Sequence, residues 1–99
     1  MINKIEMSIP NYTLIIKGNK GIINDKNTFI TKEDIDDIAR EIRLWNESYI
    51  DDTKLNENIY YINLYDENDN DIGHYKFNGA FPRNFQNLIN IIGNIYDRR

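Results

Sequence analysis

One acidic loop carries residue types that could hold a cation. In the stretch from Asp66 to Asp71, Asp66, Asn68 and Asn70 fall at the first three ligand positions of a calcium-binding loop. Asp71 stands where that loop needs glycine, and Phe77 stands where it needs the bidentate glutamate. We therefore expect a solvated hairpin loop that holds no metal and no other cofactor.

A histidine close to this loop supplies the enzymatic hypothesis. His74 is the only histidine of the chain, and imidazole is the side chain that ordinarily titrates near neutral pH. Asp69 or Asp71 could orient it, which would give a metal-dependent hydrolase built from the Asp66–Asp71 loop and His74. A nucleophile is missing from the neighbouring sequence, and the chain has no cysteine and no second histidine. We therefore expect no catalytic residues and no enzymatic activity.

The charge of the chain is unevenly distributed. Residues 33–71 carry a net charge of −10, whereas residues 1–32 and 72–99 carry +3 each, which leaves −4 overall. An acidic surface attracts a basic protein partner and raises the rate of association with it. The commonest basic targets are proteins whose own ligands are nucleic acids. We therefore expect a small acidic binding protein, an inhibitor or immunity protein that occludes the basic active site of a nuclease toxin or another nucleic-acid-processing effector. A phage-encoded inhibitor of a host defence complex, acting as a nucleic-acid mimic, is the alternative.

An expected helix over residues 32–47 would present this acidic surface. Its apolar residues recur with the spacing of one buried stripe, so most of its charged residues face away from the core. Asp36 and Arg40 are spaced as a favourable i,i+4 pair, and Leu44 is an apolar residue on the solvent side. The candidate partner-binding residues of the helix and the segment after it are Glu33, Asp36, Asp37, Arg40, Glu41, Leu44, Glu47, Asp51 and Asp52.

Two tyrosines form a second candidate contact. If Ile62 faces the core in the strand over residues 59–65, Tyr61 and Tyr65 face outward. Tyrosine is enriched in surfaces that recognise other proteins. Stacked aromatic rings on a sheet also occur in proteins that bind single-stranded RNA. Phosphates would be repelled by the acidic neighbours in the sequence, so we expect no direct nucleic-acid binding. Those neighbours are Glu57, Asp66, Glu67 and Asp69.

The elements that must position these residues follow from periodicity. Alternating residues predict strands over 4–9 and 12–17, and Pro10 marks either a kink or a tight turn between them. Weaker strand signals follow near Ile22 and near Phe29. Residues 48–57 are expected to form a polar connection to a hairpin over residues 59–78. A last helix is expected to begin at Pro82, the first helical position.

This order predicts the fold class. A strand pair, a helix, a β-hairpin and a second helix indicate an α+β domain with a mostly antiparallel sheet of 4–5 strands. Both helices should pack on one face of that sheet. The length predicts a single domain over residues 1–99.

Several further properties follow from composition. No apolar stretch approaches the ~20 residues needed to span a bilayer, and the first ten residues lack the apolar core of a signal peptide. We therefore expect a cytoplasmic protein with no membrane contact. As to self-association, a monomer or a weak homodimer is expected, the latter through the Tyr61 and Tyr65 face.

Overall fold

The computed structural model describes residues 1–55 and 58–98, and within them it contains seven strands and two helices. The α+β class is therefore confirmed, while the expected count of 4–5 strands is wrong. The elements are β1 (Lys4–Ile9), β2 (Tyr12–Lys17), β3 (Lys20–Ile23), β4 (Lys26–Phe29), α1 (Lys32–Ile42), β5 (Ser48–Ile50), β6 (Tyr60–Tyr65), β7 (Asp71–Asn78) and α2 (Phe85–Asp97).

All seven strands belong to one mixed sheet with the order β4-β3-β2-β1-β6-β7-β5. The first four strands run as an antiparallel meander, and β6 joins the free side of β1. Strand β7 pairs antiparallel with β6, and β5 adds to its other side in the parallel direction. The sheet is thus mostly antiparallel, as expected, with β1 at its centre.

The turn between β1 and β2 resolves the two readings of Pro10. Ile9 is paired directly with Tyr12, so Pro10 and Asn11 are the two central residues of a tight turn. Asn11 has a φ of 75°, the positive value that the third position of a type II turn requires. Proline at the second position presets φ for this turn and needs no ladder hydrogen bond there.

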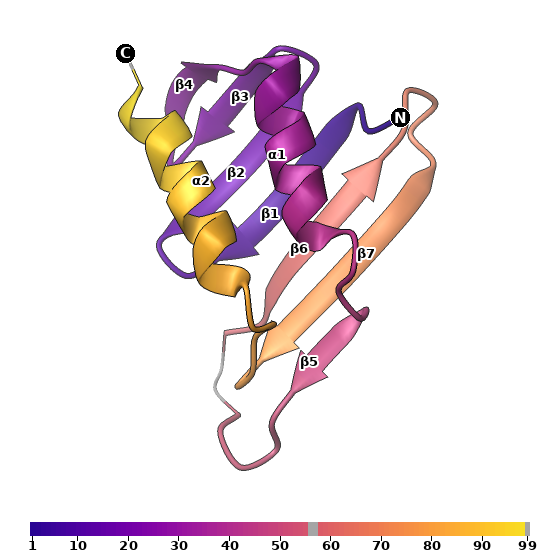
Figure 1. The fold of residues 1–99 in the computed structure, drawn as a ribbon, viewed down its shortest axis with the longest axis vertical. Coiled ribbons are helices and arrows are strands. Elements are labelled where there is room, and N and C mark those ends of the chain that lie inside the picture. The colour runs from indigo at the N-terminus through magenta and orange to yellow at the C-terminus, as the bar shows by residue number, and fades with distance from the viewer. Residues whose placement is uncertain (56–57, 99) are drawn as a thin grey trace.

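Both helices lie on the same face of the sheet, in front of it in Figure 1. The alternating residues of the central strands meet the apolar stripes of the helices and form one buried cluster. In it, Ile5 and Ile62 of the sheet are fully buried, as are Ile38 of α1 and Ile92 of α2. The opposite face, called the outer face below, carries no helix (Figure 1). In the described part of the chain, neither helix is long and apolar enough to cross a membrane.

The first helix is shorter than expected. It ends at Ile42 rather than at residue 47, with Arg43 as its C-cap. Trp45 turns back through a backbone hydrogen bond to the Ile42 carbonyl, and its indole ring packs edge-on against Phe77 and Tyr75. These tertiary contacts replace the last helical turn that the apolar spacing predicted.

The segment over residues 48–57 is not simply a polar connection. Residues 48–50 form β5, which alternates so that Tyr49 faces inward and stacks on Phe77. Three residues are too few to show a period-two pattern in the sequence. Residues 56–57 of the predicted connection lie outside the described residues.

The last helix also begins later than expected. Pro82 belongs to the turn before it, and α2 starts at Phe85 with Asn84 at the N-cap position. The Asn84 side chain makes no cap hydrogen bond, because it binds residues at the end of α1 instead. The expected hairpin is confirmed, with residues 66–70 between β6 and β7.

Two glycines with positive φ allow a matched test of the packing around β5. A Cβ at Gly79 would lie 2.9 Å from the carbonyl oxygens of Asp51 and Lys54, whereas a Cβ at Gly18 would meet nothing within 4 Å. Gly18→Ala should cost about 1–2 kcal/mol through its backbone conformation alone. Gly79→Ala should cost at least about 1 kcal/mol more, because the added methyl also overpacks this contact. Urea unfolding would measure both; equal losses would contradict the close approach.

Candidate protein-binding surface

The local sequence explains why α1 begins where it does. Thr31 is the N-cap: its side chain accepts a hydrogen bond from the Asp34 amide, and the Asp34 carboxylate accepts one from the Thr31 amide. This capping box satisfies two backbone donors at the start of the helix. Glu33 and Asp36, on either side of Asp34 in the helix, have exposed side chains.

Asp34 itself is structural. Its carboxylate is buried and accepts two hydrogen bonds from the Arg98 guanidinium, at 2.7 and 2.9 Å. Hydrogen bonds from Arg98 lower the pKa of Asp34 more than burial raises it, and those from Thr31 lower it further. The pair ties the start of α1 to the residue that follows α2. The two residues are 64 positions apart, so no local pattern indicates their contact.

Other charged side chains of α1 are also engaged within the molecule. Arg40 is 2.9 Å from the Asp37 carboxylate, so the expected pairing of Arg40 with Asp36 is wrong. Positions i and i+3 are as close on a helix as i and i+4, and Asp36 lies instead beside a groove. Glu41 accepts a 2.6 Å hydrogen bond from Asn84. Among the described residues, Glu33 and Asp36 have no ion pair.

Leu44 stands beside an aromatic hollow at the end of α1. Its side chain is 85% exposed, and the Trp45 indole next to it donates a 2.6 Å hydrogen bond to Asn84. The hollow has a volume of about 350 Å³. Tryptophan, tyrosine and arginine are enriched among the residues that contribute most of the binding energy of protein interfaces, and all three line this hollow. It is lined by Arg40, Glu41, Leu44, Trp45, Tyr49, Pro82, Arg83 and Asn84.

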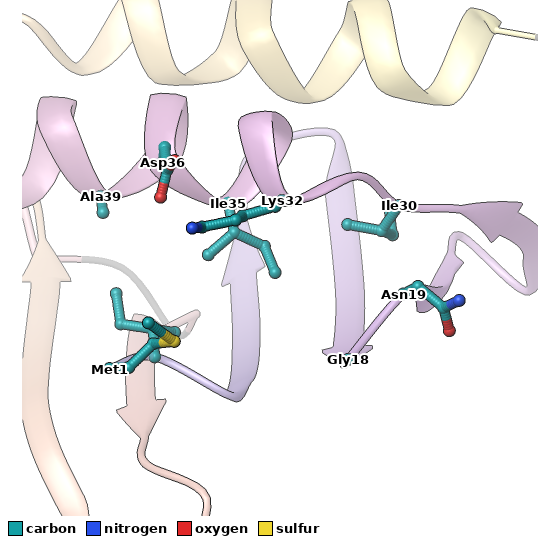
Figure 2. A pocket seen from close by; sticks show the side chains of 9 residues that line it. Met1, Gly18, Asn19, Ile30, Lys32, Ile35, Asp36 and Ala39 are labelled. Atoms are coloured by element: carbon teal, nitrogen blue, oxygen red, sulfur yellow. The ribbon is translucent and has the colours of Figure 1, made fainter.

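A second, more apolar groove runs along the other side of α1 (Figure 2). Its volume is about 420 Å³, within the range of roughly 300–1,000 Å³ that is typical of ligand sites. Lys32 and Asp36 project from the helix into it, one helical turn apart (Figure 2). The lining residues are Met1, Ile2, Gly18, Asn19, Ile30, Lys32, Ile35, Asp36 and Ala39.

The exposed side of α1 is mixed in charge. Lys32, Arg40 and Arg43 are exposed among the acids, so the helix is less negative than the block of residues 33–71 suggested. Orientation of a partner would therefore come from single carboxylates such as Asp36. Binding energy would come from the apolar and aromatic contacts around Leu44.

The remaining candidates lie away from α1. Glu47 is exposed, with a carboxylate oxygen 3.9 Å from His74 Nε2. Asp51 accepts two hydrogen bonds from Thr53, which lower its pKa, and Asp52 is exposed in the same turn. The predicted residues therefore do not form one continuous acidic patch.

The two tyrosines are on the outer face, across the sheet from α1. Tyr61 and Tyr65 alternate with the buried Ile62 and Leu64 along β6, as the alternation predicted. The Glu6 carboxylate raises the pKa of the Tyr65 hydroxyl. These tyrosines cannot share a contact surface with the acids of α1.

Asp66, which would be the first ligand of a calcium-binding loop, is hydrogen-bonded within the loop itself. The Asp66 carboxylate accepts hydrogen bonds from the amides of Asn68 and Asn70, both at 2.9 Å, and these lower its pKa. His74 Nδ1 lies 3.4 Å from Asp71, the closer of its two expected partners. Within residues 1–55 and 58–98, no group of three or more His, Cys, Asp or Glu side chains could hold a metal.

Comparison with protein-family models, with curated proteins and with solved structures finds no significant match to this chain. Sequence reasoning missed Tyr49, Arg83 and Asn84, which line the hollow beside Leu44. Tyr49 lies in β5, a strand that the sequence did not predict, and Arg83 and Asn84 precede α2, whose start was misplaced. None of the three carries a periodic signal of its own.

The Asp34–Arg98 pair makes stability depend on pH in the acid range. The folded pKa of Asp34 lies below its ordinary value of 3.8, so its stabilisation is complete above that value. It is lost as pH falls through the folded pKa. Asp34→Asn should lower the free energy of unfolding by about 2 kcal/mol at pH 7. Urea unfolding should show this difference shrinking below pH 3.8; a constant difference would contradict the ion pair.

Proposed function

We propose that this chain is a small binding protein that inhibits a basic, nucleic-acid-processing partner by covering the surface that would hold phosphates. The contact is made by the exposed side of α1 and by the Leu44 end of that helix. A nuclease toxin is the first target of this kind, and a nucleic-acid-binding defence complex is the alternative.

One observation carries the proposal: Leu44, 85% exposed, lies beside a hollow lined by tryptophan, tyrosine and arginine. An exposed apolar side chain next to such a hollow is typical of the centre of a protein interface. The carboxylates of Glu33 and Asp36, both exposed on the same helix, supply charges that a lysine or arginine of the partner could meet. Rim charges of this kind mainly set the rate and orientation of association.

The metal-dependent hydrolase has less support. Its first ligand, Asp66, is engaged in closing its own turn, and no metal-holding group of three exists among the described residues. The near neighbours of His74 are two carboxylates, and no serine, threonine or cysteine is paired with it in the described part of the chain. General acid–base chemistry alone would leave this site without a nucleophile.

The proposal is tested with single substitutions in immobilised protein. A nuclease-treated lysate of the source cells is passed over the native chain, Asp36→Lys, Leu44→Asp and the control Glu67→Lys. The control has the same charge change as Asp36→Lys, on the exposed β6–β7 turn. We expect the native chain and the control to retain a basic protein that added nucleic acid displaces. The purified partner should bind the α1 variants at least about tenfold more weakly.

Two results would overturn this function. The first is retention of the same partner by Asp36→Lys, Leu44→Asp and Glu67→Lys alike. The second is a retained partner that nucleic acid does not displace, because inhibition by covering a phosphate-binding surface requires competition. Circular dichroism of each variant verifies that the fold is intact.

A further inference from the structure

The outer face of the sheet carries a row of three lysines bounded by aromatic rings. The register aligns Tyr65, Lys4, Lys17, Lys20 and Phe29 across the neighbouring strands β6, β1, β2, β3 and β4. The three lysines and Tyr65 alternate with buried residues, and Phe29 is followed by the buried Ile30, so all five side chains lie on the face away from the helices. Lys4, Lys17 and Lys20 are called the lysine row below.

Folding alone disfavours this row. Lys4 is directly opposite Lys17, and Lys17 is directly opposite Lys20, on strands ~4.8 Å apart. Like charges in directly opposed cross-strand positions destabilise a sheet. Lys17 and Lys20 are exposed, and neither has an ion pair among residues 1–55 and 58–98. A local rule broken without a compensating contact is typical of a functional site.

The nearest acid does not neutralise the row. Glu6 is 4.0 Å from Lys4 and also acts on Tyr65, where it raises the pKa of the hydroxyl. The Lys4 ammonium also lies 5.2 Å from the centre of the Tyr65 ring. One carboxylate is therefore shared at the β1–β6 end, and the positive charge of Lys17 and Lys20 is left for a ligand.

We propose that the outer face binds single-stranded nucleic acid, with phosphates on the lysine row and bases stacked on the rings at its ends. Phe29 is 65% exposed at the β4 end, and Tyr65 lies at the β6 end. Single-strand binding combines a positive track for the backbone with aromatic side chains on which bases stack. This activity is independent of the function proposed above, since the two surfaces lie on opposite faces of the sheet.

The fold places some of the acids that disfavoured nucleic acid in the β6–β7 turn, outside strands β1 to β4. Asp66 and Glu67 belong to the β6–β7 turn, beyond the end of β6, and Glu57 lies outside the described residues. Asp71 is paired with Tyr65 and lies close to His74. Within β1 to β4 and their turns the acids are Glu6 and Asp25, against four lysines, so these strands form the track.

An anionic membrane would need a different surface. The next row of the outer face contains Ile15 and Ile22, each about half exposed, between Glu6 and Asn27. Interfacial membrane binding scales with a continuous apolar area, which this polar-flanked pair does not provide. Exposed aromatic rings and separate lysines are instead the groups that stack on bases and bind phosphates.

Fluorescence anisotropy with labelled single-stranded oligo(dT) and oligo(U) of about 15 nucleotides tests the proposal. At about 50 mM salt we expect saturable binding, with a log–log salt slope of about −2 for three phosphate contacts. Lys17→Glu should weaken binding about tenfold and raise the midpoint of thermal unfolding, because it converts two like-charge pairs into opposite-charge pairs. Phe29→Ala should also weaken binding about tenfold.

The control is Lys54→Glu, which makes the same charge change at an exposed position in the loop after β5, near the opposite end of the molecule. It should bind the oligonucleotides as the native chain does. Three results would overturn the proposal: no anisotropy change with the native chain, equal losses for Lys17→Glu and Lys54→Glu, or binding of phosphatidylserine vesicles without binding of either oligonucleotide. The last would assign the face to membranes.

Discussion

The arrangement of the molecule depends on the burial of one phenylalanine. Phe77 of β7 is fully buried, and its ring centre lies within 5.9 Å of those of Trp45, Tyr49, Phe81 and Phe85. These rings come from the end of α1, from β5, and from the turn and the start of α2. Because close-packed aromatic rings have few alternative arrangements, the positions of both helix ends and of the edge strand are coupled through one site. The hydrogen bonds of Asn84 to both Trp45 and Glu41 complete this junction.

Both helices lie on one face of the sheet, and the charges of the chain are divided among several surfaces. The acids of residues 33–71 divide among α1, the turn after β5 and the β6–β7 turn, rather than forming one surface. The lysines of β1, β2 and β3 gather on the outer face, although they are spread over seventeen residues of sequence. A net charge of −4 therefore describes neither face.

Local patterns predicted what local forces determine. Period-two alternation located β1 and β2, the β6–β7 hairpin was also predicted, and the spacing of apolar residues located the start of α1. The errors occur where distant contacts prevail. Trp45 is not helical because it packs against Phe77. Strand β5 forms because its residues pair with the free edge of β7. In the candidate surface, Leu44 was anticipated, but the hollow beside it needs residues of α1, β5 and the turn before α2 together.

The central position of β1 has a consequence for the growing chain. Its partner β2 follows after a two-residue turn, whereas its other partner, β6, begins only at Tyr60. At a synthesis rate of about 5–20 residues per second, that edge of β1 remains unpaired for several seconds, until β6 has been synthesised. During this time the hydrophobic strand Ile5, Met7 and Ile9 presents open backbone groups to other chains in the same state. The order of the strands thus makes the nascent protein most prone to aggregation before its last third has emerged.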